Sequence, residues 1–213
     1  MNDYKVRKDF NIEIPKSVKM IITILEKNGY EAFAVGGCIR DTILGRQPQD
    51  WDITTSALPQ QVKALFNKTL DTGIQHGTVT VMMSRVGYEV TTYRIDGEYN
   101  DSRHPDTVEF TSNLIEDLKR RDFTINAMVY NPTVGLVDAF DGIGDIEKKI
   151  IKCVGVAEER FGEDALRILR AVRFSAQLGF DIEDKTLAAA KDLSDTLKNI
   201  SAERIRVELE KLI

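Results

Sequence analysis

AFAVGGCIRDTILGRQPQDWDIT, residues 32–54, is the stretch that decides the fold. Its first four residues are all apolar and predict a short buried strand, which Gly36-Gly37 interrupts. A short helix is expected from Cys38 to Leu44, ending at a glycine. A second strand is expected from Asp50 to Thr54. The stretch therefore predicts a strand, a glycine turn, a helix and a strand in close succession.

Asp50 and Asp52 are the first candidates for chemistry. Residues two apart in a strand project from the same face, so these carboxylates should point together while Trp51 and Ile53 point into the core. Adjacent carboxylates repel unless a cation lies between them, and Mg²⁺ favours carboxylate and phosphate oxygens. The alternative interpretation, taken from these two residues alone, is an exposed polar strand face.

Three further residues fit an anion-binding site around these carboxylates. The Gly36-Gly37 turn opens a helix, where free backbone N–H groups can cradle a phosphate, and Arg40 lies one helical turn later. Glycine also occurs in such turns for conformational reasons alone. Glu89 lies in a predicted strand and is a candidate third carboxylate, although a solvated strand position fits its pattern equally well.

The remaining pattern is α+β followed by helices alone. Helices are expected over Ser17–Asn28 and Pro59–Phe66, and a hairpin over Gly77–Met83 and Tyr88–Arg94. A mobile loop is expected over Asp96–Thr107. After Leu114 the pattern is helical and passes Gly142 and Gly144, and from about Ala157 only helices are expected.

Composition is that of an ordinary globular chain. The 213 residues are 42% hydrophobic and 30% charged, with a net charge of −5 that argues against nucleic-acid binding through bulk charge. Cys38 and Cys153 lack a CxxC partner and are expected to be reduced thiols. Neither a membrane span nor a secretory signal is visible, so a cytoplasmic location is expected.

A polar strip is expected on a helix near residue 170. It contains Asp164, Arg167, Arg170 and Arg173, which wind over half of the helix, while Ala165, Ile168, Leu169 and Val172 face a core. A salt-bridged surface helix is the commoner cause of such a pattern. Three arginines with few nearby acids favour anion binding instead.

The motifs and their order along the chain resemble those of a known enzyme superfamily. The chain resembles the DNA polymerase β-like nucleotidyltransferases in the order of three motifs. These are an apolar residue followed by Gly36-Gly37, then Asp50-Trp51-Asp52, then Glu89 within a strand. Arg120–Met128 (RRDFTINAM) and Glu163–Phe174 (EDALRILRAVRF) further resemble class II tRNA nucleotidyltransferases and the related bacterial poly(A) polymerases.

This resemblance implies an α+β head with a mixed, largely antiparallel sheet over residues 1–153 and an all-α neck over 154–213. It implies template-independent addition of C, C and A to the 3′ end of tRNA from CTP and ATP. Asp50 and Asp52 would bind Mg²⁺ in a two-metal mechanism, with Glu89 as the third catalytic acid.

The resemblance also assigns nucleotide contacts. They fall on Gly36, Gly37, Arg40, Arg121, Asp122, Asn126, Asp164, Arg167, Arg170 and Arg173. Asp164 accepts hydrogen bonds and Arg167 donates them. Cytosine and adenine both present an amino donor beside a ring-nitrogen acceptor, whereas uracil and guanine present the reverse order. This pair would therefore select C and A without a template.

Several alternatives stay open. A bacterial poly(A) polymerase, or an enzyme that adds only C-C or only A, would share these motifs; a non-catalytic nucleotide- or RNA-binding fragment is the alternative of another class. The segment Arg94–Phe110 resembles the family's flexible loop, which favours full CCA addition. Ser201–Ile213 has an apolar face, and we expect a further C-terminal half or a second copy of the chain to cover it.

Overall fold

The computed structural model describes residues 6–97 and 108–212. The chain forms two compact units, which alternate along the sequence. The first contains Met1–Ile95, Glu109–Leu118 and Asn126–Ala139, and the second contains Asp96–Val108, Lys119–Ile125 and Phe140–Ile213. The boundary expected at Cys153 between a head and a neck stays a prediction.

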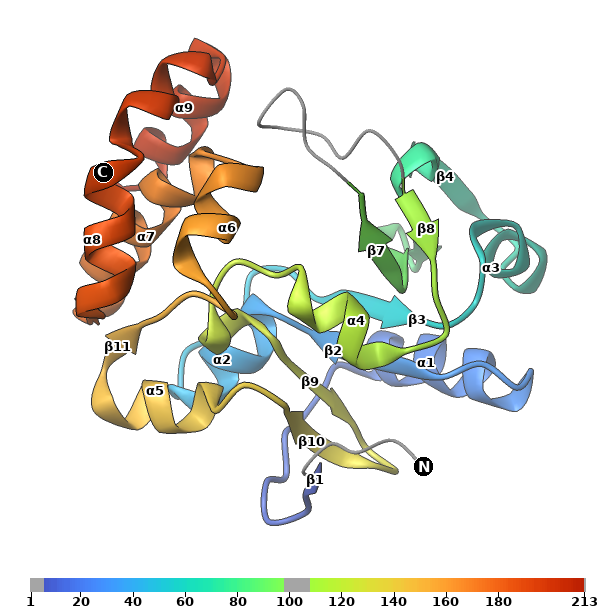
Figure 1. The fold of residues 1–213 in the computed structure, drawn as a ribbon. Helices are drawn as coiled ribbons and strands as arrows, with labels where there is room; N and C mark the ends of the chain where they lie inside the picture. Colours follow the sequence, from blue (N-terminus) through green and yellow to red (C-terminus); the bar gives the residue numbers. More distant parts are fainter. Residues whose placement is uncertain (1–5, 98–107, 213) are drawn as a thin grey trace. The chain divides into compact units, whose positions relative to one another are not determined.

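A mixed sheet is the centre of the first unit (Figure 1). In the described residues it has eight strands in the order β1-β10-β9-β2-β3-β6-β5-β4. The strands are β1 (Val6–Arg7), β2 (Ala32–Val35), β3 (Asp52–Thr55), β4 (Thr69–Gly73), β5 (Thr78–Met83), β6 (Val86–Thr92), β9 (Met128–Asn131) and β10 (Gly135–Asp138). The pairing of β3 with β6 is parallel and the other pairings are antiparallel. This confirms the predicted largely antiparallel sheet.

The middle of the sheet is apolar on both faces. Every residue of β2 and of β9 is buried; apart from Asn131 at the end of β9, these residues are apolar or aromatic, as is typical of a central strand. Helix α1 packs on β2 and β3 through four buried residues at helical spacing. The helices and helical turns of this part of the chain are α1 (Lys16–Lys27), α2 (Gly37–Ile43), α3 (Pro59–Leu65), η1 (Ile74–His76) and α4 (Leu114–Lys119).

The predicted hairpin is confirmed. Strands β5 and β6 pair in register up to Met83 and Val86, which leaves a two-residue turn. Both turn residues, Ser84 and Arg85, have positive φ (49° and 71°), as a type I′ hairpin turn requires. Strands β7 (Arg94–Asp96) and β8 (Val108–Phe110) pair with each other. The loop expected over Asp96–Thr107 lies largely outside the described residues; Asp96, its first expected residue, is instead the last residue of β7.

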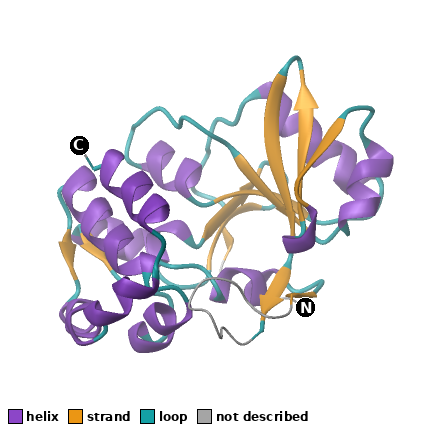
Figure 2. Cartoon of the chain, turned by 90° about the horizontal axis from the view of Figure 1, so that it is seen from above, coloured by secondary structure: helices purple, strands orange, loops and turns teal. Residues whose placement is uncertain are grey.

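The second unit is mainly helical (Figure 2). Its elements are η2 (Thr124–Asn126, shared with the first unit), α5 (Gly142–Lys148), β11 (Ile150–Ile151), α6 (Ala157–Glu163), α7 (Leu166–Leu178), β12 (Asp181–Ile182), α8 (Asp184–Asp192), η3 (Ser194–Asn199) and α9 (Ala202–Glu210). Phe123, which is fully buried, packs edge-on against Phe174 of α7 with ring centroids 5.9 Å apart. None of the helices in the described ranges is long and apolar enough to span a bilayer.

One expectation about the chain after Leu114 is wrong. The pattern there predicted helix, but Met128–Asn131 and Gly135–Asp138 form strands β9 and β10 of the main sheet. A short apolar run fits a buried strand as well as a buried helix, so periodicity alone does not distinguish them. The short strand β12 also interrupts the region from Ala157 onward that was predicted to be wholly helical.

Asn131 ties the turn between β9 and β10 to its neighbours. Its side chain is 1% exposed, and its amide donates to Glu26 Oε1 and to the Ala32 carbonyl, both at 2.8 Å. Its carbonyl accepts from the backbone N–H groups of Thr133 (2.7 Å) and Val134 (3.2 Å). The side chain therefore links α1, β2 and the turn.

Replacing Asn131 by Ala should lower the free energy of unfolding by about 2–4 kcal/mol, because the buried Ala32 carbonyl and the part-buried N–H groups of Thr133 and Val134 lose their partner. Urea titration followed by circular dichroism measures the change. Asn28→Ala is the matched control, since its exposed amide makes one bond to the Ile24 carbonyl; its effect should stay below about 1 kcal/mol. Equal effects of the two substitutions would contradict this account of the turn.

Candidate functional site

The glycine turn begins where β2 ends. Gly36 has φ 84° and ψ −133°, a conformation that essentially only glycine adopts. Its N–H donates to the Met128 carbonyl at 3.1 Å, which fixes the turn against β9. The last residue of β2, Val35, pairs with Asp52 on β3. The turn therefore starts directly beside the first residue of β3.

Asp52 and Glu89 occupy neighbouring strands at the same level. The parallel register joins Ile53 of β3 to Val90 of β6, and both of these side chains are fully buried. The residues one step earlier, Asp52 and Glu89, are exposed. Since side chains alternate along a strand and neighbouring strands lie about 4.8 Å apart, both carboxylates project from the same face. The sheet thus brings two of the predicted acids together beside the glycine turn.

The position of Asp50 differs from the expectation. Strand β3 begins at Asp52, two residues later than predicted, so strand alternation does not set the direction of Asp50. Asp50 is exposed, and Trp51 is half-buried instead of lying in the core. Ile53 is fully buried, as expected. Backbone pairing with Val35 starts only at Asp52, which explains why the strand begins there.

The acids suit a cation that arrives with its ligand. In residues 6–97 and 108–212, no three His, Cys, Asp or Glu side chains are grouped closely enough to hold a metal ion by themselves. Magnesium uses one or two carboxylates together with water and substrate phosphates. The exposed Asp50 and Asp52 therefore fit a metal–nucleotide complex better than a cation cage made of protein alone.

Cys38, beside Asp52, is not a ligand of this kind. Burial, together with the charge of Asp52, raises the pKa of its thiol to about 12. Its Sγ donates to the Val35 carbonyl at 3.3 Å. Burial likewise raises the pKa of the Cys153 thiol to about 12. Both cysteines are free and buried.

Arg40 and Asn126 are in contact with each other. Nη1 of Arg40 donates to Asn126 Oδ1 at 2.6 Å, and the guanidinium also pairs with Asp41 at 2.8 Å. Arg40 is 7% exposed and Asn126 6%. The structure thus brings together two predicted nucleotide contacts that are 86 residues apart.

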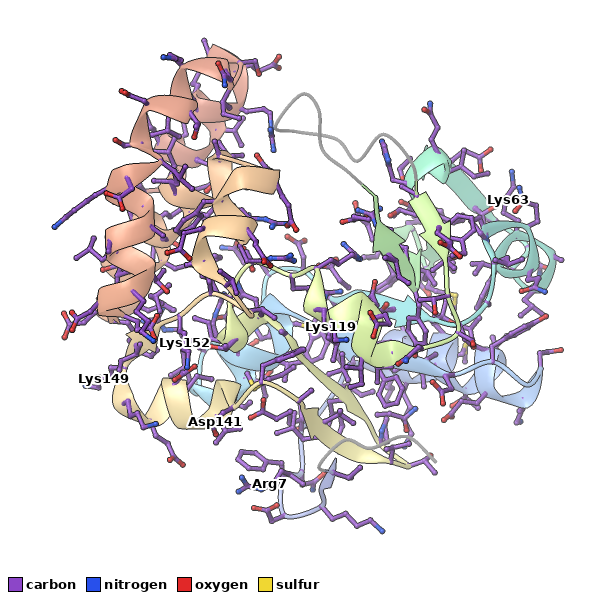
Figure 3. The ribbon with its side chains drawn as sticks, viewed as in Figure 1. Arg7, Lys63, Lys119, Asp141, Lys149 and Lys152 are labelled. Atoms are coloured by element: carbon purple, nitrogen blue, oxygen red, sulfur yellow. The ribbon has the colours of Figure 1, made fainter. Side chains whose placement is uncertain are left out.

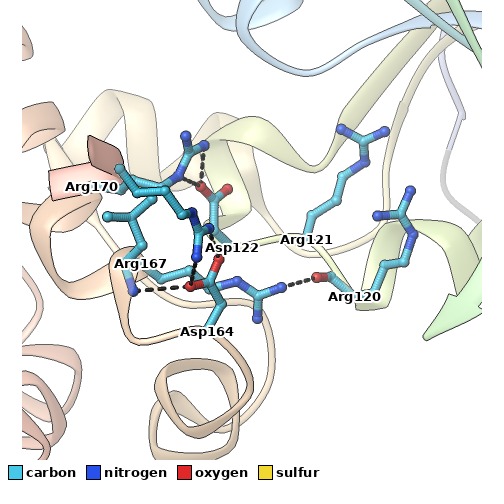
Figure 4. Close-up of a pocket in the computed structure, with 8 residues that line it drawn as sticks. Arg120, Arg121, Asp122, Asp164, Arg167 and Arg170 are labelled. Carbon is cyan, nitrogen blue, oxygen red and sulfur yellow. Dashed lines mark hydrogen bonds and ion pairs between the residues drawn. The ribbon is translucent and has the colours of Figure 1, made fainter. Parts of the chain in front are cut away.

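The second unit contains a polar cavity of about 270 Å³ (Figure 4). Five of the predicted nucleotide-binding residues line it, together with one leucine and two further arginines. The lining residues are Arg120, Arg121, Asp122, Asp164, Leu166, Arg167, Arg170 and Arg204. The Arg120–Asp122 motif and the start of α7 therefore form one site, as their shared resemblance to one family implies.

The predicted polar strip is only partly correct. Asp164 precedes α7 instead of lying on it, and Arg173 is 7% exposed and does not line the cavity. Nε of Arg173 donates to Glu208 Oε2 of α9 at 2.6 Å. Val172, expected in the core, is 48% exposed, whereas Ala165 and Ile168 are buried as predicted. Packing of α9 on α7 covers the Arg173 side of the helix.

The expectation of surplus arginines is wrong. Arg170 donates through Nε (2.8 Å) and Nη2 (2.6 Å) to Asp122 Oδ2 (Figure 4). Arg167 pairs with Glu163. The Asp122 carboxylate raises the pKa of Arg170, so this guanidinium stays charged. Sequence reasoning missed Glu208 and Arg204, because nothing local connects α9 with residues some 40 positions earlier.

Arg167 is held in a fixed orientation. Besides Glu163, it donates to the backbone carbonyls of Arg160 and Arg120, each at 2.9 Å. Burial raises the pKa of Glu163, while Arg167 and Arg160 oppose that shift. A planar guanidinium with several fixed acceptors is held in one orientation.

Family comparison agrees with the motifs. Residues 32–152 match the family described as "Poly A polymerase head domain", and residues 179–213 match "Probable RNA and SrmB- binding site of polymerase A". The CCA-adding enzyme of Lactiplantibacillus plantarum is 54% identical over 93% of this chain and 49% of its own length. That of Leuconostoc mesenteroides subsp. mesenteroides is 55% identical over 91% and 48%. The chain spans about half the length of these curated relatives.

Solved structures of CCA-adding enzymes are similar to this chain as well. The Bacillus stearothermophilus CCA-adding enzyme in complex with CTP superposes with a TM-score of 0.84 at 46% identity, over 91% of this chain and 47% of that one. The Thermotoga maritima CCA-adding enzyme complexed with tRNA matches with a TM-score of 0.78 at 26% identity, over 95% and 48%. The chain therefore belongs to the poly A polymerase head domain family, as its resemblance to class II tRNA nucleotidyltransferases predicts.

Proposed function

We propose that the chain carries the nucleotidyltransferase centre that adds C, C and A to the 3′ end of tRNA from CTP and ATP. The observation that carries this proposal is the strand register that places Asp52 and Glu89 side by side next to the Gly36-Gly37 turn. The relatives named CCA-adding enzymes, including one solved with CTP, support the same function.

The first unit would carry the chemistry. Asp50 and Asp52 would hold divalent cations, Mg²⁺ in the cell, with Glu89 as the third acid. Bound metal would activate the attacking 3′-hydroxyl and stabilise the leaving pyrophosphate. Gly36 and Gly37 would lie against the triphosphate, because a glycine backbone allows close approach. Arg40, oriented by Asn126, would add positive charge.

The second unit would select the base. Asp164 would accept from the amino group of cytosine or adenine, and Arg167 would donate to the neighbouring ring nitrogen. Arg121 and Arg170 would add positive charge, and Asp122 would hold Arg170 in place. Uracil or guanine would leave buried groups unpaired, at about 1–3 kcal/mol each.

A poly(A) polymerase is the second candidate, since the matching family is described by that name. Such an enzyme would use ATP alone and make long products. An enzyme that adds only C-C or only A would stop early with one nucleotide. Incubation with a tRNA that ends before CCA, labelled CTP or ATP and Mg²⁺ distinguishes these outcomes by product length. A non-catalytic nucleotide- or RNA-binding fragment would give no product with either nucleotide.

Asp50→Ala and Asp52→Ala should each reduce transfer by a factor of about 10³ or more, because each removes a metal ligand. Both side chains are exposed, so thermal unfolding should hardly change. Asp71→Ala, an exposed acid of β4, is the matched control and should stay active. Near-normal turnover of Asp50→Ala in Mg²⁺ would contradict the metal assignment.

Asp164→Asn should relax base choice. An amide presents a donor where the carboxylate presented acceptors, so the preference for CTP over UTP should fall about 10- to 100-fold. Competition between labelled CTP and UTP for one primer measures this ratio. Glu159→Gln, an exposed acid on α6, controls for loss of charge. An active Asp164→Asn protein with unchanged preference would exclude a protein template at this position.

RNA binding by this acidic chain should be weak and sensitive to salt. Lys185, Lys191 and Lys198 are exposed within the range that matches the RNA-binding description. About three phosphate contacts predict a slope of about −2 for log K against log salt. Titration of tRNA and of a minihelix at two salt concentrations measures the slope. Lys191→Glu should weaken binding, whereas Lys63→Glu on α3 (Figure 3) should not. Tight, salt-independent binding would contradict the prediction.

A further inference from the structure

Asp164 is held by a side chain from another helix. Nη2 of Arg204 on α9 lies 2.8 Å from Asp164 Oδ2, and Nη1 lies 3.3 Å from Oδ1. The guanidinium thus faces both carboxylate oxygens in the fork arrangement typical of Arg–carboxylate pairs. Both side chains are largely buried, at 22% and 17% exposed. Arg204 also lines the cavity that contains Arg167 and Arg170.

Helix α9 is itself fixed on α7. Glu208, one helical turn after Arg204 and on the same face, is 4% exposed. It accepts from Arg173 at 2.6 Å and lies 3.6 Å from Arg170. Ile205 packs on the small apolar cluster of Ala165, Leu166 and Ile200. The position of Arg204 is therefore set by the packing of Ile205 and by the buried ion pair between Glu208 and Arg173.

We propose that Arg204 is a positioning residue that sets base selectivity through Asp164; this inference rests on the proposed function of Asp164. A carboxylate has about four lone-pair sites, and its direction decides which of them faces the base. The fork of Arg204 occupies one side of the group, and the Leu166 N–H donates to Oδ1 at 3.1 Å. The remaining lone pairs then point in a fixed direction, toward the amino group of C or A.

Without Arg204, Asp164 can rotate while the metal-binding acids of the first unit are untouched. Arg204→Ala should therefore reduce the CTP-over-UTP ratio of kcat/KM about tenfold, the effect of one misplaced charged acceptor. Most of the change should be in KM for CTP, with kcat nearly unchanged. Arg204→Lys keeps the charge but not the fork, so it should restore only part of the ratio.

The experiment measures kcat and KM with CTP, ATP and UTP for wild type, Arg204→Ala, Arg204→Lys and Arg206→Ala. Arg206 lies two residues away, is 66% exposed and faces Glu210, so it is the matched control and should behave as wild type. The double variant Asp164→Asn/Arg204→Ala should discriminate no worse than Asp164→Asn alone, because Arg204 acts through that carboxylate.

A folded Arg204→Ala protein with the wild-type ratio would overturn the proposal, as would additive losses in the double variant. Unfolding of both Arg204→Ala and Arg204→Lys beside a folded Arg206→Ala would show a purely structural role and overturn it as well. If wild type transfers no nucleotide, the proposed function fails. Equilibrium titration with CTP and UTP then tests Arg204 separately, with loss of preference for CTP expected in Arg204→Ala and an unchanged preference overturning the proposal.

Discussion

The register of β3 between β2 and β6 is the constraint on which the proposed chemistry depends. It pairs Val35 with Asp52 on one side and Ile53 with Val90 on the other. A slip of β3 by one residue would turn Asp52 toward the core and away from Glu89 and the glycine turn. The buried Ile53 and Val90 prevent that slip, so the apolar core fixes the place of the polar site.

The second unit uses charge in a different way. Three arginines of this unit, Arg167, Arg170 and Arg173, each form an ion pair with an acidic residue of the same unit. Breaking such partly buried pairs leaves an uncompensated charge, so the pairs hold the side chains in defined orientations. The proposed base selection depends on orientation more than on charge, and the network fixes the orientation of these side chains. The same contacts join α6, α7 and α9 to the Arg120–Asp122 segment.

Sequence reasoning predicted β2, the glycine turn and the hairpin of the first unit well because their signals are local. The run Ala32–Val35, the Gly36-Gly37 break and the hairpin all depend on neighbouring residues. It was wrong where partners are distant. Strands β9 and β10 depend on pairing with β2 and β1, and the acids beside α7 come from residues 122, 163 and 208. A short stretch of sequence does not reveal which distant residues pair with it. The sequence therefore did not distinguish a row of arginines in ion pairs from a row of unpaired arginines.

The central claim is that the acids of the first unit bind a metal–nucleotide complex while the second unit selects the base. Equilibrium titration of CTP and UTP, with and without Mn²⁺, on wild type and Asp52→Ala tests it most directly. Asp52→Ala should lose the gain in CTP affinity that Mn²⁺ confers on wild type, yet keep the preference for CTP over UTP. Retention of the Mn²⁺-dependent gain, or loss of the preference together with it, would contradict the account.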